Sequence, residues 1–235
     1  MRIKPAKKLF VALLVVFGIL GIATVYAVTQ GASNVQSGTP ETYTPTPGSV
    51  SAQGGNITSL TIDATVQTKK WQGFYGNISG TITLANSAGN AYMYNWSVTP
   101  GTGVVILTQD NAFPWDQLTN GNDSAVDTAW GFTGDDKAEV TFADVAACSP
   151  VTVNGKSIGN NDNEVYLWDN TGNGYFCEYL GEDSGGTGAK DDFAFIAKIY
   201  NDASCFNGDT CDFELIVPVN PDGVTTETYY VYVEF

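Results

Sequence analysis

The sequence of 235 residues has no histidine, and its only arginine is Arg2. Without an imidazole, Ser-His-Asp catalysis, Cys-His catalysis and histidine metal ligands are all excluded. Positive charge is also scarce: only six lysines follow the first apolar run, against 25 acidic residues, which gives that part a formal charge of −19. Such a surface cannot neutralise phosphates, so the sequence excludes nucleic-acid binding and electrostatic binding to an anionic membrane surface.

Charge is absent from Leu9 to Val28, a run of twenty mostly apolar residues behind a short basic stretch. This length spans the hydrocarbon core of a membrane as a helix. The same residues fit a signal peptide, because Val25 and Ala27 are small residues at the −3 and −1 positions of a cleavage site. A third interpretation is a pilin-type leader that is cut before the apolar run. Residues 1–29 are predicted to be a signal peptide or membrane anchor, with the rest exported to the cell surface or beyond.

Sustained helical periodicity is missing beyond residue 30. Residues 30–55 are rich in Ser, Thr, Gly and Pro, and we expect a flexible, extended spacer there. Residues 56–235 alternate apolar and polar side chains in short segments separated by turns. This pattern predicts one all-β domain, an antiparallel β-sandwich of Ig-like or jelly-roll-like type. The expected strands include 57–66, 78–84, 91–98, 104–108, 138–142, 151–158, 164–168, 175–179, 193–200, 213–217 and 228–235.

All four cysteines lie in the exported part, and their even number favours disulfides. Cys205 and Cys211 flank a turn-forming pentapeptide, which favours a local bridge, and Cys148 with Cys177 is then the remaining pair. Four N-x-[ST] sequons at Asn56, Asn77, Asn95 and Asn122 are predicted glycosylation sites if the host modifies them.

The block WQGFYGNISGTITL at 71–84, followed by Tyr-Asn-Trp-Ser at 94–97, resembles a group of uncharacterised archaeal exported surface proteins. The resemblance covers residues 56–98, and the FELIVP segment at 213–218 is similar to their C-terminal ends. It implies an archaeal cell envelope and a β-rich ectodomain, and it supplies no catalytic or binding residues.

The abundant acids predict a cation site more readily than catalysis. Asp162, Glu164 and Asp169 lie in two runs rich in Asp and Asn, which offer the hard oxygen ligands that Ca²⁺ prefers. The alternative is that Asp and Asn simply form β-turns there. Adjacent carboxylates such as those at 135–136, 182–183 and 191–192 lie in turn-like or Gly-containing stretches, and we expect no enzyme activity.

Aromatic residues are the last feature. Trp115 and Trp130 lie in loop-like stretches, so they are predicted to be the exposed pair that could stack on a sugar or anchor a partner.

Two functional hypotheses follow. The first is a structural or adhesive envelope protein, a filament or surface-layer subunit, in which residues 28–55 or the strand 57–66 complete an open sheet in the next copy. Its partners would be other copies, or other surface proteins and glycans. The alternative is a tethered carbohydrate- or partner-binding module.

Overall fold

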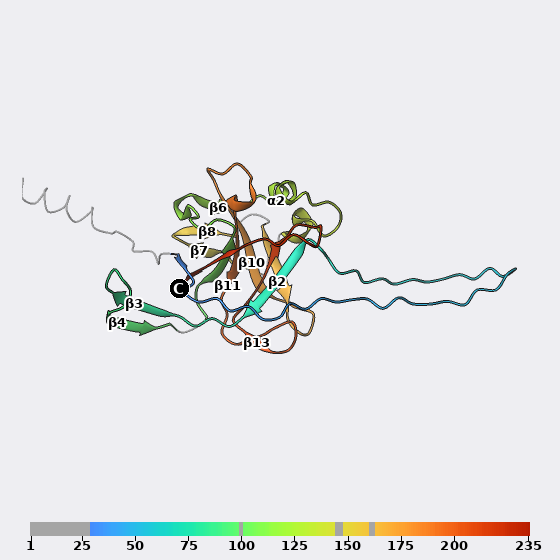
Figure 1. Cartoon of the computed structure of the whole chain (residues 1–235), viewed down its shortest axis with the longest axis horizontal. Coiled ribbons are helices and arrows are strands. Elements are labelled where there is room, and N and C mark those ends of the chain that lie inside the picture. The colour runs from blue at the N-terminus through green and yellow to red at the C-terminus, as the bar shows by residue number, and fades with distance from the viewer. Residues whose placement is uncertain (1–28, 99–100, 144–147, 160–162) are drawn as a thin grey trace, which may run out of the picture.

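The computed structural model describes residues 29–98, 101–143, 148–159 and 163–235. Residues 1–28 of the leader predicted at 1–29 and the predicted calcium ligand Asp162 lie outside these ranges. Within the described ranges, no helix is both long and apolar enough to cross a membrane. The described chain is mostly β, with antiparallel sheets and few helices, which confirms the class predicted from the period-two pattern (Figure 1).

The main layer is a seven-stranded sheet in the order β1-β15-β5-β11-β10-β6, with β9 also paired to β10. Its central strands are buried on both faces, so their sequences read as continuous apolar runs. The strands are β1 Gln30–Gly31, β5 Val104–Thr108, β6 Leu118–Asn120, β9 Glu164–Trp168, β10 Gly174–Asp183, β11 Phe193–Lys198 and β15 Tyr230–Glu234.

A second layer of two strands packs on one face of this sheet. It pairs β2 (Trp71–Gly76) with β14 (Phe213–Pro218), and Leu215 lies opposite Phe74. Leu215 and Val217 belong to the main core cluster together with Phe195 of β11. Segments 137 to 147 residues apart in the chain therefore meet here, a pairing that local sequence patterns do not reveal.

Three small hairpins complete the β structure. The turn between β7 (Val151–Val153) and β8 (Lys156–Ile158) has positive φ at Asn154 (45°) and Gly155 (73°), as the Asn-Gly pair predicts. The other two hairpins are β3–β4 and β12–β13. Their strands are β3 Thr81–Ala85, β4 Tyr92–Ser97, β12 Ala203–Ser204 and β13 Thr210–Cys211.

The prediction that no helix follows residue 30 was wrong. Helix α2 runs over Asp123–Trp130: the Asn122 side chain accepts a hydrogen bond from the Ala125 N–H, and Gly131 ends the helix with φ 68°. Such caps are ordinary helix boundaries. The predicted strand at 138–142 is instead α3 (Ala138–Thr141). Two short 3₁₀ turns are η1 (Trp115–Gln117) and η2 (Lys190–Asp192).

Residues 32–69, called the arm from here on, leave the body and return to it without forming a helix or strand. Figure 1 shows the arm as two extended limbs that project from one end of the body. The chain reverses at Gly54-Gly55, where Gly55 has φ 85° and the Asn56 N–H donates to the Gln53 carbonyl. Most of the spacer predicted at 30–55 forms the outgoing limb, but its first residues, Gln30 and Gly31, form strand β1 instead. The strand predicted at 57–66 lies in the return limb, where it pairs with no strand of the described residues.

Candidate functional site

The return limb of the arm contains a strand-like segment without a strand partner. Leu60, Ile62, Ala64 and Val66 alternate with Thr61, Asp63 and Thr65, the period-two pattern of a half-buried strand. Every residue from 33 to 67 is nevertheless exposed, and Ile62 and Val66 are 77% and 83% exposed. The segment therefore has the sequence of a β-strand with one buried face, but the described chain offers it no sheet to join.

The hairpin β3–β4 has an apolar face that is exposed. Its register places Ile82 opposite Trp96 and Leu84 opposite Tyr94. Since side chains alternate between the two faces of a strand, these four residues share one face. All four are about half exposed, and the Tyr94 and Trp96 rings lie 4.8 Å apart between centroids. This surface is called the apolar hairpin face from here on.

The opposite face of the hairpin is polar. Thr81 lies opposite Ser97, and Thr83 lies opposite Asn95. The base of the hairpin follows Gly80, where a Cβ atom would stand 2.3 Å from the ring of Phe235. The chain at the base of the hairpin therefore packs closely against the Phe235 ring, just after β15, and a side chain at position 80 would have to displace that ring.

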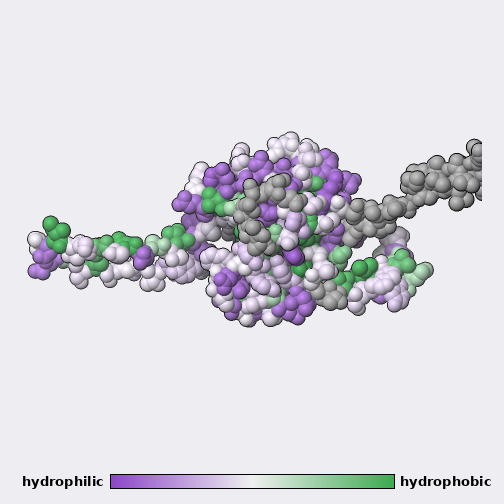
Figure 2. Space-filling model, turned by 180° about the vertical axis from the view of Figure 1, so that it is seen from behind, coloured by the Kyte–Doolittle hydropathy of each residue, from purple (hydrophilic) through white to green (hydrophobic). Residues whose placement is uncertain are grey.

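The arm and the hairpin project from opposite ends of the body. Figure 1 places the arm at one end of the long axis and β3–β4 at the other. The view from behind agrees, and it shows apolar residues along the arm and on the hairpin (Figure 2). An element at one end that fits an element at the other end makes a head-to-tail contact, which generates open filaments when its rotation does not close into a ring.

These two projections are also the neutral parts of an acidic protein. Residues 71–109 contain no charged side chain, and residues 32–67 contain only Glu41 and Asp63. From Asp110 onward the chain has 23 acidic residues and four lysines. Bodies with this charge repel one another, whereas the arm and the hairpin carry little charge that would add to this repulsion.

The edge of the main sheet at β15 is partly covered within the chain itself. Gln30 and Gly31 of β1 pair with Val233 and Tyr232, and the Thr29 hydroxyl donates to the Glu234 carboxylate at 2.7 Å. Beyond β1 lies a groove of about 560 Å³. Its lining includes Val35, Asn111, Tyr229 and Tyr230. The start of the spacer thus already occupies part of this edge.

Both predicted disulfides are present, which indicates an oxidising environment. Cys148–Cys177 ties the loop before β7 to β10, and Cys205–Cys211 closes the β12–β13 hairpin.

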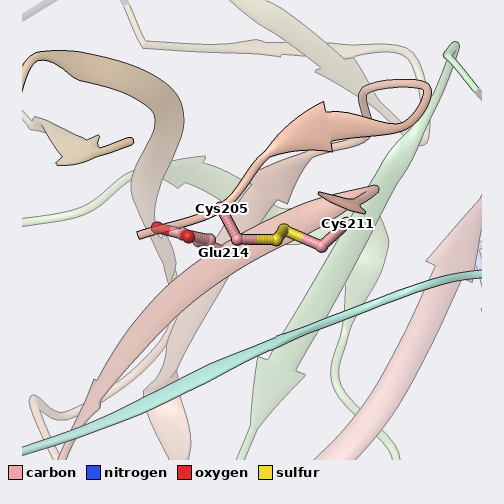
Figure 3. Close-up of side chains that lie close together, drawn as sticks. All are labelled: Cys205, Cys211 and Glu214. Atoms are coloured by element: carbon pink, nitrogen blue, oxygen red, sulfur yellow. A yellow bond between two sulfur atoms is a disulfide. The ribbon is translucent and has the colours of Figure 1, made fainter. Parts of the chain in front are cut away.

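Glu214 lies beside the second bridge, as Figure 3 shows. Within the described part of the chain, Cys205, Cys211 and Glu214 are the one group of such side chains close enough to hold a metal ion. The two sulfurs are bonded to each other, so neither is the thiolate that a metal requires. The Glu214 carboxylate accepts from the Phe206 N–H at 2.8 Å, and burial raises its pKa. Glu214 therefore links the β12–β13 hairpin to β14, and these three side chains do not offer a set of free metal ligands.

The predicted calcium ligands do not come together in the described chain. Glu164 is buried at the start of β9, and Asp169 follows the last residue of that strand. The Asp169 carboxylate accepts from the Thr171 N–H, the Thr171 hydroxyl and the Asn173 N–H. These bonds lower its pKa. Asp169 therefore caps its own turn, as the alternative interpretation expects.

The expected exposure of Trp115 and Trp130 is corrected by the structure. Trp130 ends α2 and is only 5% exposed, because the stretch taken for a loop is a helix packed on β11. Its indole N–H donates to Glu227 at 2.8 Å. Trp115 is half-buried between Phe113 and Tyr232. Trp96, on the apolar hairpin face, is far more exposed than Trp130. The alternation in YMYNWS indicates that Trp96 lies on one face of a strand. Alternation alone does not show whether other residues cover that face.

The four sequon asparagines are all exposed. Asn56 lies at the tip of the arm, Asn77 follows β2, and Asn95 is on the polar face of the hairpin. Asn122 caps α2 through its side-chain oxygen. Their glycosylation stays a prediction.

No protein-family model matches this chain, and no curated protein or solved structure matches it either.

Proposed function

We propose that this chain is an extracellular structural subunit that assembles head to tail, the arm of one copy adding a strand to a sheet of the next. The observation that carries the proposal is the segment from Leu60 to Val66, which has strand periodicity, exposed side chains and no strand partner in the described ranges. Addition of a strand to an open edge satisfies backbone hydrogen bonds and gives each alternate side chain a neighbour. The added strand would also widen the sheets into a fuller β-sandwich across the subunit boundary.

The position of the arm supports a polymer rather than a closed dimer. A two-fold dimer needs a self-complementary patch, whereas this molecule carries its unpaired strand at one end only. Disulfides and an acidic, soluble body suit a surface exposed to the outside medium.

A carbohydrate-binding module, the alternative from the sequence, loses much of its support. Its predicted aromatic platform needs Trp115 and Trp130 on one exposed surface, but Trp130 is in the core. Its predicted calcium ligands are also not gathered among the described residues.

The test replaces the apolar side of the arm without changing its length. In the variant Leu60→Ser/Ile62→Ser/Val66→Ser, we expect polymers to disappear from material sheared from the host cell surface and viewed by negative-stain electron microscopy. Because these side chains are exposed, the thermal unfolding of the body should not change.

The matched control alters the other side of the same segment, as Thr61→Ser/Asp63→Asn/Thr65→Ser. This variant should polymerise like the native chain. Filaments of native length in the first variant, or no polymer in the native protein, would overturn the proposal.

A further inference from the structure

We infer that the acceptor of the donated arm is the β3–β4 hairpin of the neighbouring copy, an assignment that rests on the proposed function. The hairpin is a two-stranded sheet whose outer edges pair with no strand in the described chain. An isolated two-stranded hairpin is marginally stable in water, and a third strand with an apolar face is what such a sheet needs. The return limb of the arm is a segment of this kind.

The two elements match in length and in pattern. The segment from Leu60 to Val66 covers seven residues, against five in β3 and six in β4. Paired along the hairpin, its four apolar side chains would extend the apolar hairpin face. Cross-strand neighbours on one face lie close enough to touch, and aromatic rings beside aliphatic side chains form favourable pairs.

The polar sides match as well. Thr61, Asp63 and Thr65 would lie on the same side as Thr83 and Asn95. A glycan on Asn95 would project from this polar side and leave the apolar side free. Hairpin residues 81–97 carry no charge, so the one charged side chain of the donated segment, Asp63, meets no other acid there.

Other open edges fit this role less well. The β15 edge is already paired with β1 at Gln30 and Gly31 of the same chain. The outer edge of β2 begins at Trp71, two residues after the arm ends, so it lies at the root of the arm rather than at the far end of the body. Of these three described edges, only that of the hairpin combines a free edge, an unpartnered apolar face and a position opposite the arm.

Complementation between two variants tests the assignment. The donor-deficient chain is Leu60→Ser/Ile62→Ser/Val66→Ser, and the acceptor-deficient chain is Leu84→Asp, which places a charge on the apolar hairpin face. We expect each full-length chain, purified in mild detergent, to stay monomeric when alone. Mixed in equal amounts, they should form a one-to-one dimer, because one intact arm meets one intact hairpin. Light scattering after size-exclusion chromatography would then measure a mass twice that of the monomer.

Ser87→Asp is the matched control, because it adds the same charge to the exposed turn of the same hairpin, away from both the apolar hairpin face and the side that would face Asp63. It should polymerise as the native chain does. If Leu84→Asp polymerises normally while the donor-deficient chain does not, the hairpin is not the acceptor, although strand donation stands. If the mixture stays monomeric, the assignment is likewise overturned. If the donor-deficient chain itself polymerises, the proposed function fails first.

Discussion

Loss of the Cys148–Cys177 bridge is expected to lower the free energy of unfolding by about 3.6 kcal/mol in the variant Cys148→Ala/Cys177→Ala. The bridge spans 29 residues of sequence. Cross-linking a loop of that size removes chain entropy from the unfolded state, and that entropy returns when the bridge is absent. The measurement is equilibrium unfolding in guanidinium chloride under non-reducing conditions.

The second bridge provides the comparison. Cys205 and Cys211 are only six residues apart, so their replacement should cost about 2.2 kcal/mol by the same relation. All four cysteines are buried, which makes the packing losses of the two double variants similar in kind. A larger loss from the short loop than from the long one would contradict the entropic account.

A second large effect is expected from the buried carboxyl group of Glu178. This side chain of β10 is fully buried, and one of its oxygens accepts from the Ile216 N–H of β14 at 2.8 Å. The other oxygen, Oε1, has no hydrogen-bond partner in the described part of the chain. Burial raises the pKa of Glu178 well above its usual value, against the lowering effect of the Ile216 bond. The neutral carboxyl is therefore the form that the core favours.

The raised pKa of Glu178 determines how the free energy of unfolding depends on pH. Above a pH of about 4.5 an unfolded Glu has lost its proton, whereas the folded protein keeps it until the raised pKa is reached. The unfolding free energy thus falls as pH rises through that interval, by about 1.4 kcal/mol for each unit of the pKa difference. Glu178→Gln keeps an acceptor for Ile216 and cannot ionise. We expect it to flatten the dependence of thermal stability on pH between about 5 and 9.

Glu41→Gln is a suitable control for this experiment, because it removes one negative charge from the exposed arm. Its profile should run parallel to that of the native protein. A Glu178→Gln profile with the native slope would show that ionisation of Glu178 does not oppose folding.

Local patterns were sufficient for most strands of the main sheet and for the Asn154-Gly155 turn, because short apolar runs, a period of two and a turn residue with positive φ are local properties. They failed for α3. Its first N–H groups, at Ala138 and Glu139, are capped by the carboxylate of Asp127, eleven and twelve residues away. The sequence around 138–142 holds no cap of its own and alternates like a strand.

For α2, the sequence does contain a usable signal. Asn122 at the N-cap and Gly131 after the last residue are ordinary helix boundaries, although Asn122 is also the first residue of a sequon. The arm and the apolar hairpin face show a different limit of prediction from sequence. The alternation from Leu60 to Val66 was recognised, but whether such a face is covered depends on the rest of the fold. Only the structure shows that this segment and the hairpin face are both uncovered, and that they lie at opposite ends.

The arm and the hairpin both project along the long axis of the molecule, and this has a mechanical consequence for the proposed polymer. Tension on a filament would act parallel to the paired strands at each junction. Backbone hydrogen bonds between strands run across the strand direction. A pull along the strands therefore loads all bonds of a junction together in shear, instead of opening them one after another as peeling does. The Ser/Thr/Pro-rich outgoing limb would act as a compliant tether beside this joint, taking up extension before the junction bears the full force.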